Sequence, residues 1–189
     1  MPRKYELQKR AERLAETRQR IVEAAVELHT TEGPAKTSIS AVAERAGVQR
    51  HTVYAHFPDL RSLLAACSGH WESLNPFPDP AAWFAIEDPV RRLRAALDDV
   101  YAWYEQVEPA LALFRRDATL VPENGELVER EAAELAALAD RLASGLRPRR
   151  AARAAIGHAL EFETWRSLVR RQGLSRKAAV ELMAQLAGV

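Results

Sequence analysis

The chain has 189 residues, of which 48% are hydrophobic and 28% are charged. This length and composition are typical of a globular protein with one domain, or with a small module joined to a larger one. No apolar run approaches the roughly 20 residues that cross a bilayer, and the basic N-terminus lacks the apolar segment of a secretion signal. The lone cysteine, Cys67, excludes an internal disulfide. These features predict a cytoplasmic protein.

The charge is unevenly distributed, although the net charge is only +1. Residues 1–70 hold 11 Lys or Arg against 8 Asp or Glu, whereas residues 71–189 hold 16 against 18. Residues 1–16 are interpreted as a basic N-terminal extension. Two alternatives stay open for it, a solvated helix and a segment that contacts phosphates.

Helical spacing recurs along the chain and no segment alternates apolar and polar residues for long, which predicts an all-α fold. A first helix is expected over residues 17–32, with Thr17 as N-cap and Gly33 after its end. A second is expected over 39–46 behind Ser38, and a third over 49–57 before Pro58. A fourth follows over 60–74.

The second and third helices flank Gly47, which predicts a helix-turn-helix whose second helix enters a DNA major groove. If Val53 and Phe57 face the core, the polar residues between Gln49 and His56 lie largely outside. Arg50 could then donate two hydrogen bonds to a guanine, and Gln49 could bond a base edge or a phosphate. The alternative is a helical hairpin with a polar face.

The stretch TSISAVAERAGVQRHTVYAHFPDLRSLL resembles the DNA-binding signature of the tetracycline-repressor-type (TetR/AcrR) regulators of bacteria. The resemblance extends over residues 17–64 and implies a homodimeric repressor that binds a palindromic DNA operator and releases it when a small-molecule effector binds. It also implies DNA contacts from a set of polar residues in the second and third helices. These residues are Ser38, Ser40, Arg50, His51, Thr52, Tyr54 and His56.

Two positions depart from the family pattern. His29 stands where an aromatic residue is common, and Leu60 stands where a lysine usually begins the fourth helix and meets a phosphate. We expect Arg61 or the basic extension to compensate in part for the missing lysine.

The remainder of the chain is predicted as a larger helical domain. On this interpretation residues 17–59 form the DNA-binding domain and residues 60–189 form the effector-binding and dimerisation domain. Four prolines between residues 76 and 89 mark a boundary or a folded connection. Helices are expected over 89–106, 109–118, 126–144, 149–172 and 176–186, with breaks at Asn124-Gly125, Gly145 and Gly173.

Several residues on apolar helical faces are candidates for an effector pocket, although core packing is the more common role for such residues. They are Trp71, Trp103, Tyr104, Phe114, His158, Phe162 and Trp165. For His158 we expect a buried hydrogen bond to a carboxylate, because no second ligand lies at metal-binding spacing. No cofactor and no metal are predicted.

Apolar residues spread around more than one stripe of the last two predicted helices, which favours a dimer that buries them as a four-helix bundle. The predicted interface residues are Ile156, Leu160, Val169, Ala179, Leu182, Met183 and Leu186. Charged side chains at positions 161, 163, 166 and 170 could pair at the rim.

Two other classes of protein remain as alternatives. An all-α enzyme would have to use His158, Glu161, Glu163 and Cys67, but no nucleophile and base recur within a motif and no phosphate loop is present. A dimeric helical adaptor would leave the exposed polar set around Arg50 unexplained.

Overall fold

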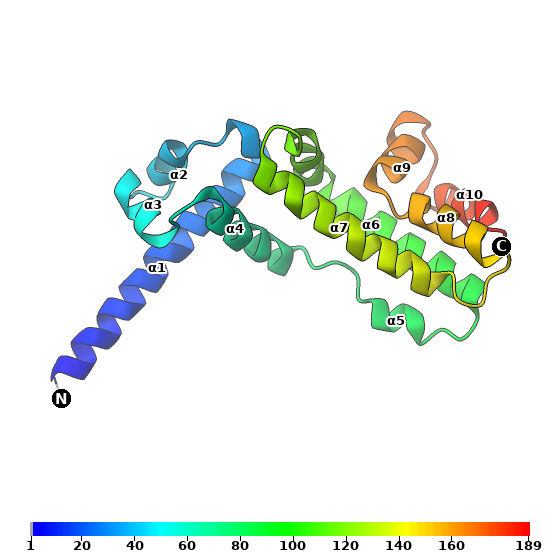
Figure 1. The fold of residues 1–189 in the computed structure, drawn as a ribbon, viewed down its shortest axis with the longest axis horizontal. Coiled ribbons are helices and arrows are strands. Elements are labelled where there is room, and N and C mark those ends of the chain that lie inside the picture. Colours follow the sequence, from blue (N-terminus) through cyan, green and yellow to red (C-terminus); the bar gives the residue numbers. More distant parts are fainter. Residues whose placement is uncertain (1) are drawn as a thin grey trace. The chain divides into compact units, whose positions relative to one another are not determined.

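A computed structural model describes residues 2–189, with side chains from Tyr5 onward, and consists of helices and connecting turns without a strand among these residues (Figure 1). The elements follow in chain order: α1 (Pro2–Thr31), the short helix η1 (Pro34–Lys36), α2 (Ile39–Arg45), α3 (Arg50–His56), α4 (Leu60–Leu74), α5 (Pro80–Phe84), α6 (Pro89–Asp117), α7 (Pro122–Leu142), α8 (Arg149–Ala159), α9 (Phe162–Arg166), the π-helix η2 (Ser167–Arg171) and α10 (Arg176–Leu186). The predicted all-α fold is confirmed.

The chain divides into two compact units. The N-terminal unit contains the residues through Pro76 together with Pro109–Val128, and the C-terminal unit contains Phe77–Glu108 and Glu129–Val189. Helix α6 therefore contributes to both units. The predicted domain limits at residues 16/17 and 59/60 stay predictions.

The core of the N-terminal unit lies where α1 packs against α2 and α4. Ile21, Ala25 and Leu28 share one face of α1 and are buried with Val53 and Phe57. Each fully buried Ile, Leu, Val or Phe side chain contributes about 1.5–3 kcal/mol relative to exposure. Burial of the apolar face of α3 in this core sets the orientation of α3.

Local capping residues set the boundaries of the short helices. The Ser38 hydroxyl accepts a hydrogen bond from the Ala41 N–H at 3.1 Å, and Asp59 caps α4 through the Ser62 N–H at 2.7 Å. Gly47 has φ +64°, a conformation that side-chain-bearing residues rarely adopt, and it turns the chain between α2 and α3.

The prediction that Thr17 caps the first helix is wrong. Helix α1 continues from Pro2, and the Thr17 hydroxyl donates to the Arg13 carbonyl at 2.8 Å inside the helix. Residues 2–16 are mostly good helix formers, so the helix does not need to begin at a cap. Residues 5–16 of the basic extension are thus exposed and belong to the first half of α1.

Two predicted helix breaks are also wrong. Helix α6 runs through Pro109, where buried Val107 and Leu111 hold it on both sides of the proline. Helix α7 begins at Pro122, so Asn124 lies in its first turn, fully buried, with its Nδ2 donating to the Phe114 carbonyl at 2.8 Å. The asparagine stabilises the end of α6 instead of breaking α7.

The helix predicted over residues 149–172 is interrupted at Leu160. Buried tyrosines of α6 hydrogen-bond to the carbonyls at the end of α8: the Tyr101 hydroxyl donates to Ala159 at 2.9 Å and the Tyr104 hydroxyl donates to Leu160 at 2.6 Å. These tertiary bonds satisfy carbonyls that a continuous helix would have paired internally. The chain then forms α9 and η2.

The proline-rich connection is folded. Asp79 caps the short helix α5, and Trp83 is buried with its indole N–H donating to Asp99 at 2.7 Å. The Phe77 ring lies edge-on to Trp83 and Trp103, at centroid distances of 6.2 and 5.2 Å. No helix in residues 2–189 combines the length and apolarity that a membrane crossing requires.

Residues at the C-terminal end of α6 hydrogen-bond to the loop that follows α1. The buried Asp117 carboxylate accepts from the Ala35 N–H at 2.9 Å, and Arg116 donates to the Glu32 carbonyl at 2.9 Å. The Arg116 hydrogen bond lowers the pKa of Asp117 below its usual range. Gly33, with φ +99°, leaves room for this contact, because a Cβ there would lie 2.4 Å from both the Arg116 and the Asp117 side chains.

His29 lies in the N-terminal core, where its Nδ1 is 3.3 Å from the Cys67 sulfur. Burial lowers the pKa of His29 to about 4 and raises the pKa of the Cys67 thiol to about 12. His29 is therefore neutral in the folded protein at neutral pH.

We predict an acid-sensitive component of stability from His29. Because its pKa is lower in the folded than in the unfolded chain, unfolding takes up a proton between pH 6.5 and 4, and stability falls as the pH falls through this window. The loss at pH 4.5 relative to pH 7 is on the order of 2–3 kcal/mol. Urea denaturation at both pH values should show that His29→Phe loses less stability on acidification than the wild type. Equal pH dependence would contradict the assignment, and His70→Phe on α4 is the control.

Candidate nucleic-acid interface and ligand region

The polar residues of α3 lie on its outer face because Val53 is buried beneath them. Gln49, Arg50, His51 and Tyr54 are exposed, whereas Thr52 and His56 are half-buried. Gln49 occupies the N-cap position without a capping side-chain bond, so its amide remains available to a partner. The prediction that α3 presents donors outward thus agrees with its burial pattern.

Arg50 and Tyr54 form one exposed pair. They lie four residues apart, with the Arg50 guanidinium donating to the Tyr54 hydroxyl at 3.2 Å and its carbon 5.6 Å from the ring centroid. Among the described residues Arg50 has no carboxylate partner. Its charge is therefore balanced only by solvent and remains available to an acceptor on a base or phosphate.

The side chains of α2 and α4 that were predicted to contact DNA differ in whether they already have a partner within the protein. Ser40 is exposed, whereas the Ser38 hydroxyl already caps α2. Arg61 forms a bidentate ion pair with Glu126, with one of the two contacts at 2.8 Å. A phosphate contact by Arg61 would have to compete with this carboxylate.

The predicted effector residues are divided between the two units. Trp71 and Phe114 belong to the N-terminal unit, where Phe114 packs edge-on to His29 at 6.4 Å. Trp103, Tyr104, Phe162 and Trp165 gather in the C-terminal unit, where the last three have centroids 5.4–5.7 Å apart.

The indole N–H of Trp165 is the least satisfied polar group of this aromatic cluster, which we define as Trp103, Tyr104, Phe162 and Trp165. Trp165 is fully buried, and its Nε1 has no hydrogen-bond partner among the described residues. Leaving such a group unpaired costs about 1–3 kcal/mol. Arg170 stacks over the ring at 5.1 Å and pairs with Glu108 at 2.7 Å.

His158 is more than half exposed, so the predicted burial is wrong. Its Nδ1 lies 3.5 Å from a Glu161 oxygen and 3.2 Å from the Thr164 hydroxyl. The break after α8 places this side chain at the surface. In residues 2–189 no group of three His, Cys, Asp or Glu side chains comes together as metal ligands would.

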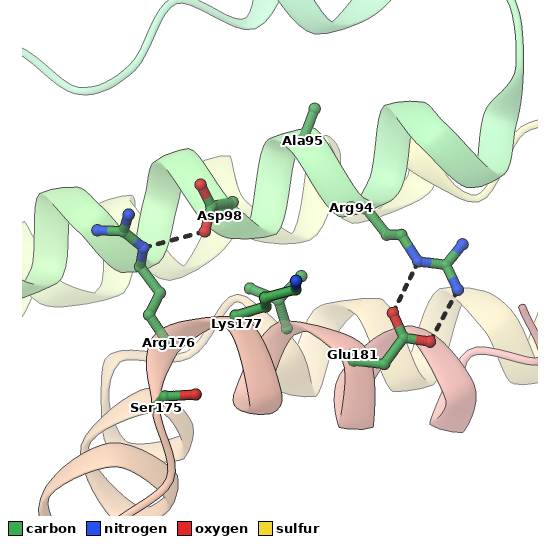
Figure 2. A pocket seen from close by; sticks show the side chains of 8 residues that line it. Arg94, Ala95, Asp98, Ser175, Arg176, Lys177 and Glu181 are labelled. Carbon is green, nitrogen blue, oxygen red and sulfur yellow. Dashed lines mark hydrogen bonds and ion pairs between the residues drawn. The ribbon is translucent and has the colours of Figure 1, made fainter.

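An open cleft of about 660 Å³ lies between α6 and α10 (Figure 2). Two pairs of charged side chains line it: Arg94 with Glu181 at 2.9 and 3.0 Å, and Arg176 with Asp98 at 3.0 Å. None of the predicted effector residues lines it.

Most residues predicted for the dimer interface lie inside the C-terminal unit. Ile156, Leu160, Ala179 and Met183 are buried there, and Val169 is half-buried. Leu182 and Leu186 of α10 are exposed by 42% and 57%. Of the proposed rim residues, Arg166 and Arg170 pair with Glu108 of their own chain.

A basic N-terminal extension was predicted, with a solvated helix as one alternative, but the stripe that Lys9, Arg13 and Arg20 form along α1 was not identified. The i, i+4, i+11 spacing of these three residues would have revealed it. The roles of Tyr101 and Asp117 were also missed, since their partners lie far away in sequence.

A short helix held by its apolar face behind a glycine turn, with its donors outside, defines a helix-turn-helix DNA-binding protein. Residues 21–67 match the family model of the bacterial regulatory proteins of the tetR family. Residues 21–67 therefore form a DNA-binding domain of the type found in the TetR family of transcriptional regulators.

Solved structures support this fold over nearly the whole chain. A TetR-like transcriptional regulator from Rhodococcus sp. RHA1 is 22% identical, with a TM-score of 0.63 over 91% of this chain and 93% of that one. A putative fatty acid metabolism regulator from Clostridium perfringens is 14% identical, with a TM-score of 0.64 over 89% and 97%. The fatty acid degradation regulator FadR from Bacillus halodurans is 18% identical, with a TM-score of 0.61 over 90% and 93%. No curated protein matches the chain.

We predict that Arg50→Ala weakens binding to the operator by about 1–3 kcal/mol and relaxes discrimination at one base pair, because a bidentate donor to a base edge is removed. Titrations against the operator and its single-base variants would measure both effects. Tyr54→Phe, which removes only the hydroxyl that Arg50 meets, should cost less. An Arg50→Ala protein that still discriminated every base pair would show that α3 is not used in this way.

Proposed function

We propose that this protein is an effector-responsive repressor that binds a palindromic operator as a homodimer and reads it through α3. The observation that carries the proposal is the exposed Arg50–Tyr54 pair on a helix whose opposite face is buried. We assign base contacts to Gln49, Arg50 and His51. Ser40, Thr52, Tyr54 and His56 are proposed to contact the backbone or adjacent bases.

The homodimer is proposed to form through α8 and α10. These helices pack on each other within one chain, and their outer faces carry the exposed Leu182 and Leu186 of α10 and the small residues Ala151 and Ala154 of α8. Small residues permit close helix approach, and a two-fold contact would bury the leucines of both copies. The buried members of the predicted interface would then support this surface from beneath.

The effector is proposed to bind in the aromatic cluster. Its rings offer an apolar environment, and the unpaired Trp165 N–H offers one donor, so the matching ligand has an apolar body and a hydrogen-bond acceptor. Fatty acyl compounds have this chemistry, and two of the structurally similar proteins are described as fatty acid regulators. The ligand would release DNA only if it prefers a conformation in which the two α3 helices are misplaced.

We predict that Leu182→Glu together with Leu186→Glu yields a monomer, because four charges would face one another in the proposed dimer. Light scattering gives the mass, and a DNA titration should show far weaker binding to the full palindrome. Circular dichroism of the monomer should retain the helical content. A dimeric double variant with normal operator affinity would place the interface elsewhere.

For the effector, we predict that fatty acids or their methyl esters raise the melting temperature of the wild type and release operator DNA. Trp165→Phe, which keeps an aromatic ring but removes the donor, should weaken this binding about tenfold, as expected when one hydrogen bond is removed. DNA affinity of the ligand-free variant should stay unchanged. Equal compound binding by wild type and variant, or none to the wild type, would contradict the proposal.

A further inference from the structure

The first half of α1 is a helix with no protein partner. Residues 5–16 are exposed at every position, yet the helix is continuous with the buried half that begins at Ile21 (Figure 1). Exposed helices of this length are marginal in water on their own, so the stability of the first half depends on continuity with the core.

The basic stripe of Lys9, Arg13 and Arg20 runs along this exposed half as far as the core. At 100° per residue these side chains fall within about 40° of one another, and the stripe extends about 16 Å along the helix axis. The Arg20 guanidinium lies 4.0 Å from the position that a Cβ would take on Gly47, in the turn between α2 and α3. The stripe therefore begins beside the helix-turn-helix and leads away from it.

One carboxylate, Glu16, lies on the same side of α1 as the stripe, but in the described part of the chain no ion pair joins it to the three basic residues. Among the described residues, Lys9, Arg13 and Arg20 form no ion pair, whereas Arg45, Arg61 and Arg116 of the same unit all pair with carboxylates. Two glutamates of α1 are held by glutamines instead: Gln8 donates to Glu12 at 3.2 Å and Gln19 to Glu23 at 2.9 Å. With Glu16 counted, this side of α1 keeps a surplus of two positive charges between residues 9 and 20.

We propose that the basic stripe binds the phosphate backbone of DNA adjacent to the segment that α3 reads, so that each copy holds more of the duplex than its helix-turn-helix covers. A duplex carries one negative charge per about 1.7 Å when both strands are counted, or one per about 3.4 Å of each strand, so about 16 Å along one strand carries roughly five phosphates. The contact is independent of base sequence. The proposal rests on the proposed reading of DNA by α3, whose exposed face is the interface that the stripe extends.

Among residues 5–16, the opposite side of the helix carries only two large apolar residues, Leu7 and Leu14, both exposed. This side could contact a second copy of the chain or an anionic membrane surface, as basic amphipathic helices do. Two leucines offer little apolar area, and the continuity of the stripe with the turn at Gly47 favours DNA.

The test compares the salt dependence of DNA binding between full-length variants. The logarithm of the binding constant is plotted against the logarithm of salt concentration, using a duplex that contains the operator and flanking sequence. For Lys9→Gln together with Arg13→Gln, the slope should become shallower by about 0.9 for each phosphate that the variant no longer neutralises, with unchanged preference among operator variants. Arg91→Gln together with Arg147→Gln removes the same charge from exposed positions outside both proposed interfaces and should leave the slope unchanged.

A wild-type slope in the Lys9/Arg13 variant, or an equal change in the Arg91/Arg147 control, would overturn the proposal. A second pattern would also overturn it. In that pattern, changing Leu7 and Leu14 to Gln abolishes dimerisation or binding to anionic phospholipid vesicles, while the Lys9/Arg13 variant binds DNA normally. Failure of the proposed reading by α3 has a different signature. In that case Arg50→Ala would leave operator preference intact, while the change of slope in the Lys9/Arg13 variant would persist.

Discussion

The burial of one face of α1 against α2 and α4, together with the packing of α3 on α2, is the constraint on which the DNA-binding surface depends. Ile21, Ala25 and Leu28 occupy this face, and Val53 of α3 packs into the same core. Since α3 has only seven residues, it would not be stable as an isolated helix. Its orientation, and therefore the outward placement of Arg50, is a consequence of the core.

Helix α6 is the element that the two units share. Its middle part supplies Tyr101 and Tyr104, whose hydroxyls bind the carbonyls at the end of α8, while its last residues hold the loop before α2 through Asp117 and Ala35. The lack of space for a side chain at Gly33 makes this last contact close. Helix α6 thus contains both Tyr104 of the aromatic cluster and Asp117, which binds the loop before α2. In the proposed function, effector binding at the cluster would act on this loop through α6.

Features with local causes were predictable from the sequence. The bounds of α2, α3, α4 and α10 could be predicted to within a residue or two, because Ser38, Asp59 and Ser175 are local caps and Gly47 is a local turn. The orientation of Arg50 also followed from the period of Val53 and Phe57. The incorrect predictions concern residues whose role depends on distant partners: packing carries α6 through Pro109, and Asn124 hydrogen-bonds to the end of α6. No local signal marks the interruption at Leu160, which is stabilised by a tyrosine 56 residues away.

The most direct test of the account is selection of bound duplexes from a random library by the wild-type protein, followed by sequencing. The account predicts two inverted copies of one short half-site, with centres about one helical turn, roughly 34–36 Å, apart or a multiple of that distance, as two α3 helices related by a two-fold axis require. Enrichment of a single half-site without a partner, or no enrichment over the starting library, would contradict it.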